Sequence, residues 1–183
     1  MESIRKEINL EKPLIFIKCD DNIASNGFVS KNMYSLELYS KHVCNVLSNY
    51  GMVQNKSLVL DFPDFLNEDL YSHFIRGYYD GDGSFCSRYT KQGRFQSLIT
   101  ITSTEKFCVK CLEIIREKTG ISGGGIYDAS NHNGVTKVIS ISGTNQSKKV
   151  LDWMYNDAEL FIKRKHDLYV ENLVNKCKYS SAA

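Results

Sequence analysis

The sequence predicts an α+β fold in which an antiparallel sheet packs against helices. Three observations indicate this fold class: a helix pattern that ends in a glycine-rich stretch at residues 74–85, two alternating segments directly after it, and a second helix pattern from about residue 104. The chain has 183 residues, of which 42% are hydrophobic and only two are proline. It is therefore long enough for one good core or for two small packed repeats.

The stretch at residues 74–85 reads Phe-Ile-Arg-Gly-Tyr-Tyr-Asp-Gly-Asp-Gly-Ser-Phe. Gly77 and Gly81 are four residues apart, so they share one helix face on which a second backbone can approach closely. Asp80 and Asp82 lie where the helix ends, and acids at such a point can hold a metal ion. A plain turn is the commoner meaning of an Asp-Gly tetrapeptide. The helix pattern before it and the acid-free strands after it favour a carboxylate site.

The elements after this stretch follow from alternation, turn residues and helix caps. Residues 84–89 and 94–102 are predicted strands, joined by a turn at 90–93 that ends in glycine. A helix is expected over about 104–118, starting with a capping box whose first residue is Thr102. The rest of the chain predicts, in order, a strand near residue 126, a turn at 131–134, a strand over 136–142 and helices over about 146–155 and 158–176.

The first 60 residues repeat part of that order. Residues 2–7 align with 113–118, and residues 35–38 align with 138–141, ahead of a helix in each copy. The chain is therefore expected to hold one complete repeat preceded by the back half of another, whose first helix and hairpin are absent. The expected organisation is a partial first repeat over 1–66, a complete repeat over 67–178 and a disordered tail over 179–183.

The predicted hairpin has a charge pattern that suits nucleic acid. The net charge of +2 is too small to indicate such a partner by itself, but residues 84–104 contain three basic side chains and no acid. Alternate side chains of a hairpin can face the major groove, where Arg suits guanine and Gln suits adenine. A half-exposed sheet that merely faces water explains the polarity but not the absence of acids. The expected reading face carries Cys86, Arg88, Thr90, Gln92, Arg94, Gln96, Leu98 and Thr100, with Lys91 in the turn, and the apolar face carries Phe85, Phe95, Ile99 and Ile101.

The composition also bounds the compartment. No apolar run approaches the ~20 residues needed to span a bilayer, and the N-terminus is charged rather than signal-like. The six cysteines, without a secretory signal, are best interpreted as reduced thiols. We therefore expect a soluble intracellular protein, in the cytoplasm or an organelle, with no membrane partner.

Residues 75–83, Ile-Arg-Gly-Tyr-Tyr-Asp-Gly-Asp-Gly, resemble the signature of the LAGLIDADG homing endonucleases at the glycines and at both acids. The resemblance implies αββαββα repeats, in which a curved antiparallel sheet packs on helices. It also implies a site-specific endonuclease of double-stranded DNA, encoded in an intron as a mobile element. In that family one acid per repeat binds Mg²⁺ ions that activate water and stabilise the leaving oxygen. The matching acid here is Asp82, while Asp80 is expected to brace the helix end.

Further roles follow from the same resemblance. The family has one lysine per repeat near the scissile phosphates, and Lys165 and Lys56 match that place through the repeat correspondence. Ser103 and Thr104 stand where the family has a polar residue that organises water. The DNA contacts implied by the resemblance are Arg88, Thr90, Lys91, Gln92, Arg94, Gln96, Thr100 and Ser103.

This chain contains one motif, whereas the family has two repeats in one chain or a dimer of single-repeat chains. We therefore expect two copies to associate through residues 74–82, unless an upstream segment supplies a second motif helix. Two other functions remain open. One is a DNA-binding protein that does not cleave, and the other is an intron maturase that binds RNA.

Overall fold

The computed structural model describes residues 5–6, 11–18, 32–37, 39–52, 59–129 and 136–175. The chain divides into two compact units, Met1–Asn49 and Tyr50–Ala183. The repeat boundary expected at residue 66 concerns sequence correspondence and stays a prediction.

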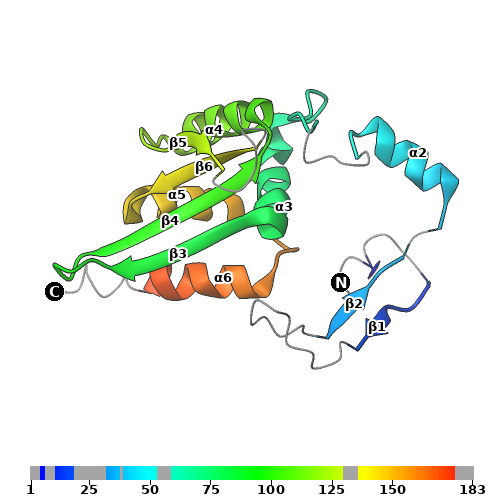
Figure 1. Ribbon diagram of the computed structural model, residues 1–183, viewed down its shortest axis with the longest axis horizontal. Helices are drawn as coiled ribbons and strands as arrows, with labels where there is room; N and C mark the ends of the chain where they lie inside the picture. Colours follow the sequence, from blue (N-terminus) through cyan, green and yellow to red (C-terminus); the bar gives the residue numbers. More distant parts are fainter. Residues whose placement is uncertain are drawn as a thin grey trace. The chain divides into compact units, whose positions relative to one another are not determined.

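The described residues of the first unit include a pair of short strands and a helix. Strand β1 (Ile15–Ile17) pairs antiparallel with β2 (Met33–Ser35), and helix α2 (Lys41–Asn49) follows (Figure 1). The rings of Phe16 and Tyr34 lie 5.3 Å apart across this pair. No residue of α2 is buried. A two-stranded sheet of this kind contributes little stability by itself.

The second unit is built on a four-stranded antiparallel sheet with the strand order β3-β4-β6-β5 (Figure 1). The sequence-predicted strands are confirmed, with ends that differ by one or two residues, and the turn predicted at 131–134 lies outside the described residues. The strands are β3 (Gly83–Tyr89), β4 (Phe95–Ser103), β5 (Gly125–Asp128) and β6 (Lys137–Ser142).

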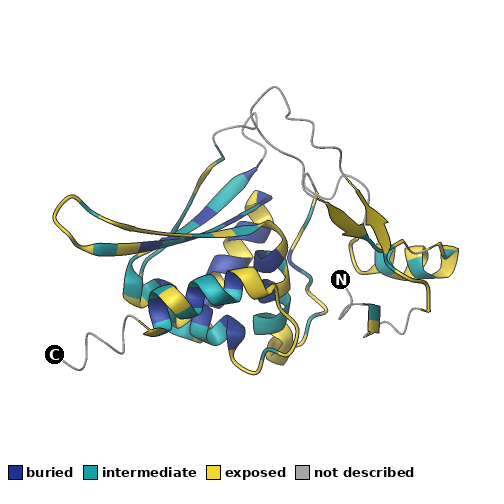
Figure 2. Cartoon of the chain, turned by 90° about the horizontal axis from the view of Figure 1, so that it is seen from below, coloured by how far each residue is buried: buried dark blue, intermediate teal, exposed yellow. Residues whose placement is uncertain are grey.

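The helices of the second unit lie on one side of this sheet, as both views show (Figures 1 and 2). Helices α4 and α5 contact the central strands, α3 contacts α5 and β4, and α6 contacts β3. The α+β class expected from the sequence is therefore confirmed. The helices are α3 (Tyr71–Asp82), α4 (Glu105–Thr119), α5 (Thr144–Tyr155) and α6 (Lys163–Tyr169), which continues into the π-helical segment η3 (Val170–Asn175).

The core lies between the helices and the covered face of the sheet. Residues directly opposite in the register share a face, so Phe85, Ile99 and Ile141 point to the helices in one row. Ile101 and Ile139 form the next row, and the four isoleucines are fully buried. Burying each such side chain stabilises the fold by about 1.5–3 kcal/mol. The predicted apolar face of the hairpin is thus confirmed.

The cap of α4 differs from the expectation. The N-cap is Thr104, whose extended backbone (φ −68°, ψ 161°) lets its hydroxyl accept the Phe107 N–H at 3.2 Å. Thr102 is still in β4, opposite Val138, so the predicted capping box at Thr102 was wrong. The strand continues to Ser103, one residue past its predicted end, because β6 supplies a partner for it.

The last helix also begins later than predicted, at Lys163 instead of residue 158. The backbone before it makes its hydrogen bonds with α3 side chains. The Ile162 N–H donates to Asp80 Oδ2 at 2.9 Å, and the Leu160 carbonyl accepts from Arg76 Nε at 3.2 Å. These long-range bonds satisfy groups that a helix would otherwise use, so the segment stays non-helical.

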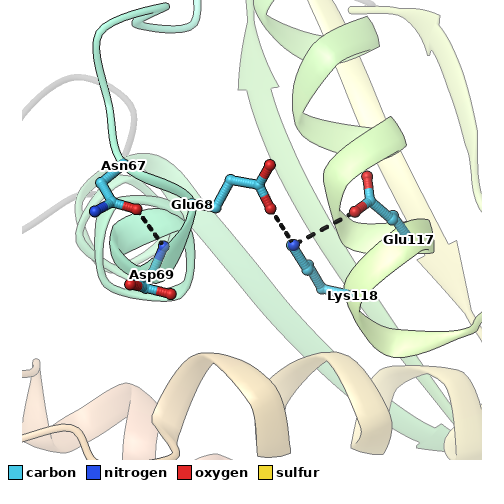
Figure 3. Close-up of polar contacts among 5 residues, drawn as sticks. All are labelled: Asn67, Glu68, Asp69, Glu117 and Lys118. Atoms are coloured by element: carbon cyan, nitrogen blue, oxygen red, sulfur yellow. Dashed lines mark hydrogen bonds and ion pairs between the residues drawn. The ribbon is translucent and has the colours of Figure 1, made fainter.

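The start of α3 is tied to the end of α4 through a short 3₁₀ turn, η2 (Glu68–Leu70). Asn67 caps this turn by accepting the Asp69 N–H at 3.2 Å. Lys118 Nζ lies 2.6 Å from Glu68 Oε2 and 3.3 Å from Glu117 Oε1 (Figure 3). Glu68 and Glu117 both raise the pKa of Lys118, Glu68 the more strongly.

No helix within the described ranges is long and apolar enough to cross a membrane.

Candidate functional site

The C-terminal end of α3 leads directly into β3, and glycine is required at the junction. The Gly83 N–H donates to the Tyr79 carbonyl and closes the last turn. A Cβ atom built on Gly83 would lie 2.3 Å from the ring of Tyr79 and 2.6 Å from its carbonyl oxygen. A side chain does not fit there unless Tyr79 shifts, so the chain can follow this path only with glycine at position 83. Asp82 is the last residue of the helix on that path.

The two carboxylates of the motif have opposite environments. Asp80 is 6% exposed; it accepts the Tyr155 hydroxyl at 2.9 Å and the Ile162 N–H at 2.9 Å. Asp82 is exposed, and its carboxylate makes no hydrogen bond or ion pair with any residue that the structure describes. Asp80 therefore braces the fold, and Asp82 is the acid that a ligand can reach.

Lys165 lies at the same helix end, but its ammonium group is turned toward the backbone. Only 5% of the residue is exposed. Nζ donates to the Tyr79 carbonyl at 2.6 Å and to the Gly83 carbonyl at 2.5 Å, and it lies 4.9 Å from the centre of the Tyr79 ring. Burial lowers the pKa of Lys165 from its ordinary value, opposed mainly by the negative charge of Asp80. Contact of Lys165 with DNA stays a prediction.

The face of α3 that carries Gly77 and Gly81 is open. A Cβ atom added at either glycine meets no heavy atom within 4 Å among the described residues. Both glycines are exposed. The surface therefore has room for another element, which is what the sequence spacing predicts.

The sheet face turned away from the helices is called the open face here. It is formed by every second residue of the strands: Ser84, Cys86 and Arg88 on β3, Gln96, Leu98, Thr100 and Thr102 on β4, Val138, Ser140 and Ser142 on β6, and Gly125 and Tyr127 on β5. Arg88 lies directly opposite Gln96, and Ser84 lies opposite Thr100. This face contains no acidic side chain, and Asp82 stands at the residue before β3 begins.

Four of the expected DNA contacts lie at the tip of the hairpin, which is exposed (Figure 2). Thr90 holds the turn together, because its Oγ1 accepts the Arg94 N–H at 3.1 Å and its own N–H donates to the Arg94 carbonyl. Lys91 and Gln92 are the central turn residues, and both are exposed. Arg94 is exposed and stands just before β4.

Ser103, an expected DNA contact, is not brought to this surface. Ser103 is 3% exposed, and its Oγ accepts the Tyr78 hydroxyl at 3.0 Å on the helix side of the sheet. Lys56 lies outside the described residues. No group of three or more His, Cys, Asp and Glu side chains that could hold a metal occurs in the part of the chain that the structure describes.

Sequence reasoning missed the role of Arg76. This buried guanidinium donates to the Met154 carbonyl at 3.1 Å and to the Leu160 carbonyl at 3.2 Å, and Nη1 lies 2.9 Å from His73 Nδ1. One signal was present, because Arg76 precedes Asp80 by four residues and so shares its helix face. The partners 78 and 84 residues away could not be found from local spacing.

No family model matches the chain. Among curated proteins, the chain is 27% identical over 97 residues to the DNA-directed RNA polymerase subunit Rpo1C of Methanocaldococcus jannaschii. This match covers 53% of the chain and 10% of that protein, so the chain spans about a tenth of the relative's length.

Three similar solved structures are homing endonucleases or meganucleases described with DNA. The archaeal intron-encoded homing endonuclease I-Vdi141I, complexed with DNA, is 25% identical with a TM-score of 0.44, over 57% of this chain and 67% of that one. The LAGLIDADG homing endonuclease I-LtrWI, bound to target DNA, is 18% identical with a TM-score of 0.46, over 62% and 39%. The LAGLIDADG meganuclease I-AabMI, bound to uncleaved DNA, is 22% identical with a TM-score of 0.44, over 61% and 38%. The chain is thus similar to LAGLIDADG homing endonucleases, and it spans less than two thirds of the last two.

Proposed function

We propose that this chain is a site-specific, metal-dependent endonuclease of double-stranded DNA of the LAGLIDADG type. One observation carries the proposal. Asp82, the only exposed acid of the motif, ends the helix at the rim of a sheet face that has basic and amide side chains and no acid. A site that cuts a phosphodiester needs this combination of a reachable carboxylate and a surface that tolerates the negative DNA backbone.

The open face supports recognition of duplex DNA. Arg88 and Gln96 lie opposite each other in the register, and both side chains are exposed. These residue types pair with the major-groove edges of guanine and adenine. Lys91 lies in the turn at the hairpin tip, outside the paired strands, and we assign it to a phosphate and not to a base edge. The target sequence is therefore read by β3 and β4, and the turn adds affinity.

Asp82 fits a magnesium ion that is shared with DNA. Magnesium is commonly bound by one or two carboxylates, with water and substrate phosphates completing its shell. Asp82 offers one exposed carboxylate, which matches that mode and does not match an ion held by this chain alone. When bound, Mg²⁺ supplies Lewis-acid stabilisation of phosphate oxygens. The chain's own part is to present Asp82 at the rim of the open face and to orient the duplex through the hairpin.

A second copy would add the second carboxylate. The space beside Gly77 and Gly81 supports contact with another α3, and residues 74–82 of two copies would then bring both Asp82 side chains to one place. We therefore propose a homodimer through this helix as the cleaving form.

The test is a selection of bound duplexes from a randomised double-stranded library, followed by cleavage of the selected duplex with Mg²⁺ or with EDTA. We expect cleavage with Mg²⁺ only. Asp82→Asn should abolish cleavage and leave affinity for the selected duplex unchanged, because the carboxylate holds metal and reads no base. Cutting by the Asp82→Asn variant would refute the assignment of the site.

A DNA-binding protein that does not cleave is the second candidate. It is favoured by the single exposed motif acid of one chain, since a shared site needs two. Retained duplex binding without cleavage at any protein concentration would select it. Competition between the selected duplex and a structured RNA distinguishes the maturase function, in which the RNA would displace the duplex.

A further inference from the structure

We infer that Lys165 is a positioning residue, which acts on the backbone that carries Asp82 and does not contact the phosphate of bound DNA. The inference rests on the proposed function, because it concerns the acid of that site. It assigns to α6 the task of fixing the end of α3.

The contacts of Lys165 lie on both sides of Asp82. Its ammonium group donates to the carbonyl of Tyr79, three residues before the acid, and to the carbonyl of Gly83, the residue after it. An ammonium group has three N–H donors, and two are used here. With 5% of the residue exposed, little of the group remains for a phosphate.

The position suits a cation on electrostatic grounds. The last carbonyls of a helix form the negative end of its dipole, and the Tyr79 carbonyl, which already accepts the Gly83 N–H, has a second lone pair for Lys165. A carboxylate such as Asp82 at that end is repelled by these carbonyls. Lys165 compensates the carbonyls and also joins the last turn of α3 to the first residue of β3. Because the junction at Gly83 packs closely against Tyr79, the two hydrogen bonds of Lys165 across it restrict where the Asp82 backbone lies.

Side chains of α3 also help to position α6, the helix that carries Lys165. Asp80 accepts the N–H of Ile162, the residue before α6, and Arg76 donates to the carbonyls of Met154 and Leu160. These bonds hold the connection between α5 and α6 against the inner face of α3. Lys165, on α6, then contacts the C-terminal end of α3. The buried residues Arg76 and Asp80 are thus linked to the exposed Asp82 through the α5–α6 connection and Lys165.

The experiment compares Lys165→Met with Lys163→Met, a matched control that removes one positive charge from an exposed position of the same helix. In the free protein, hydrogen exchange of the Gly83 amide, which donates to Tyr79, should become about tenfold faster or more in Lys165→Met and stay unchanged in the control. The Mg²⁺ concentration for half-maximal cleavage should rise in Lys165→Met alone.

Salt dependence separates positioning from a phosphate contact. Loss of one phosphate contact lowers the slope of log affinity against log salt by about 0.9. We expect the same slope for Lys165→Met as for the wild type. A reduced slope, or unchanged exchange at Gly83, would overturn the inference.

A measurement on the wild type covers the case in which Lys165→Met does not fold. The ¹⁵N signal of the Lys165 ammonium group should be protected from solvent exchange in the free protein and should keep its position when duplex is added. A signal that shifts on DNA binding would place the group on the phosphate and reject the inference. If the wild type binds no duplex, the proposed function fails, while the exchange of Gly83 still decides the role of Lys165.

Discussion

At the residue scale, Asp80 and Asp82 show how burial divides two identical side chains between structure and chemistry. Both acids are present in the motif, and their spacing alone predicts that they point in different directions from a helix. What the sequence lacks is the identity of the partners. Asp80 meets Tyr155 and Ile162, which are 75 and 82 residues away. The bracing role expected for Asp80 agrees with these contacts, whereas the partners themselves required the fold.

Asp80→Ala should therefore be strongly destabilising. The substitution removes a charged acceptor and leaves a buried hydroxyl and a partly buried N–H without a partner, at a cost of about 2–4 kcal/mol. Urea unfolding followed by circular dichroism measures the change, with Asp82→Ala as the matched control. A loss below about 1 kcal/mol for Asp80→Ala would contradict the bracing role.

The hairpin residues should differ in the kind of affinity they supply. Arg88→Ala should weaken binding to the selected duplex by about 1–3 kcal/mol and relax the preference at one or two base pairs. Arg94→Ala is expected to act in the same way. Lys91→Ala should weaken all sequences alike and lower the salt slope by about one. Fluorescence anisotropy with the selected and a scrambled duplex distinguishes these results, and equal behaviour of all three variants would indicate an electrostatic patch.

At the element scale, the sequence identified elements better than it identified their ends. Alternation of apolar residues predicts β3, β4 and β6, because one face of β4 and of β6 is buried and Phe85 of β3 is partly buried on the same side of the sheet. The errors lie where distant groups compete for the backbone. Helix α6 starts late because side chains of α3 form hydrogen bonds with the Leu160 carbonyl and the Ile162 N–H. Strand β4 extends past Thr102 because β6 pairs with it. The repeat correspondence in the sequence identifies Lys165. The direction of its ammonium group depends on the start of α6 at Lys163, which the sequence does not predict.

The cap of α4 at Thr104 can be tested directly. Thr104 Oγ1 accepts the Phe107 N–H, and its hydroxyl donates to the Leu60 carbonyl. Thr104→Ala should lower the free energy of unfolding by about 0.5–2 kcal/mol. Thr102→Ala, on the open face of β4, should cost less, since its side chain caps no helix. Thermal or urea unfolding of both variants measures the difference, and a larger loss for Thr102→Ala would restore the capping box.

At the scale of the whole molecule, the glycine face of α3 relates stability to assembly. Gly77 lies inside a helix, where glycine is about 0.8–1 kcal/mol less favourable than alanine. A Cβ atom added at Gly77 meets no heavy atom within 4 Å among the described residues, so a larger residue is expected to be tolerated there. Close approach of a second helix, which a side chain would prevent, would account for a glycine at this position.

Gly77→Leu should therefore make the single chain more stable and prevent its association. The leucine gains helix propensity, while its side chain occupies the space that a second α3 needs. We expect the wild type to sediment as a dimer at tens of micromolar and Gly77→Leu as a monomer that unfolds at a higher urea concentration. Cleavage should be lost together with the dimer, because the second Asp82 is lost, whereas duplex binding through one hairpin remains. A wild type that stays monomeric, or a dimer that accepts the leucine, would reject the helix contact and with it the two-carboxylate site.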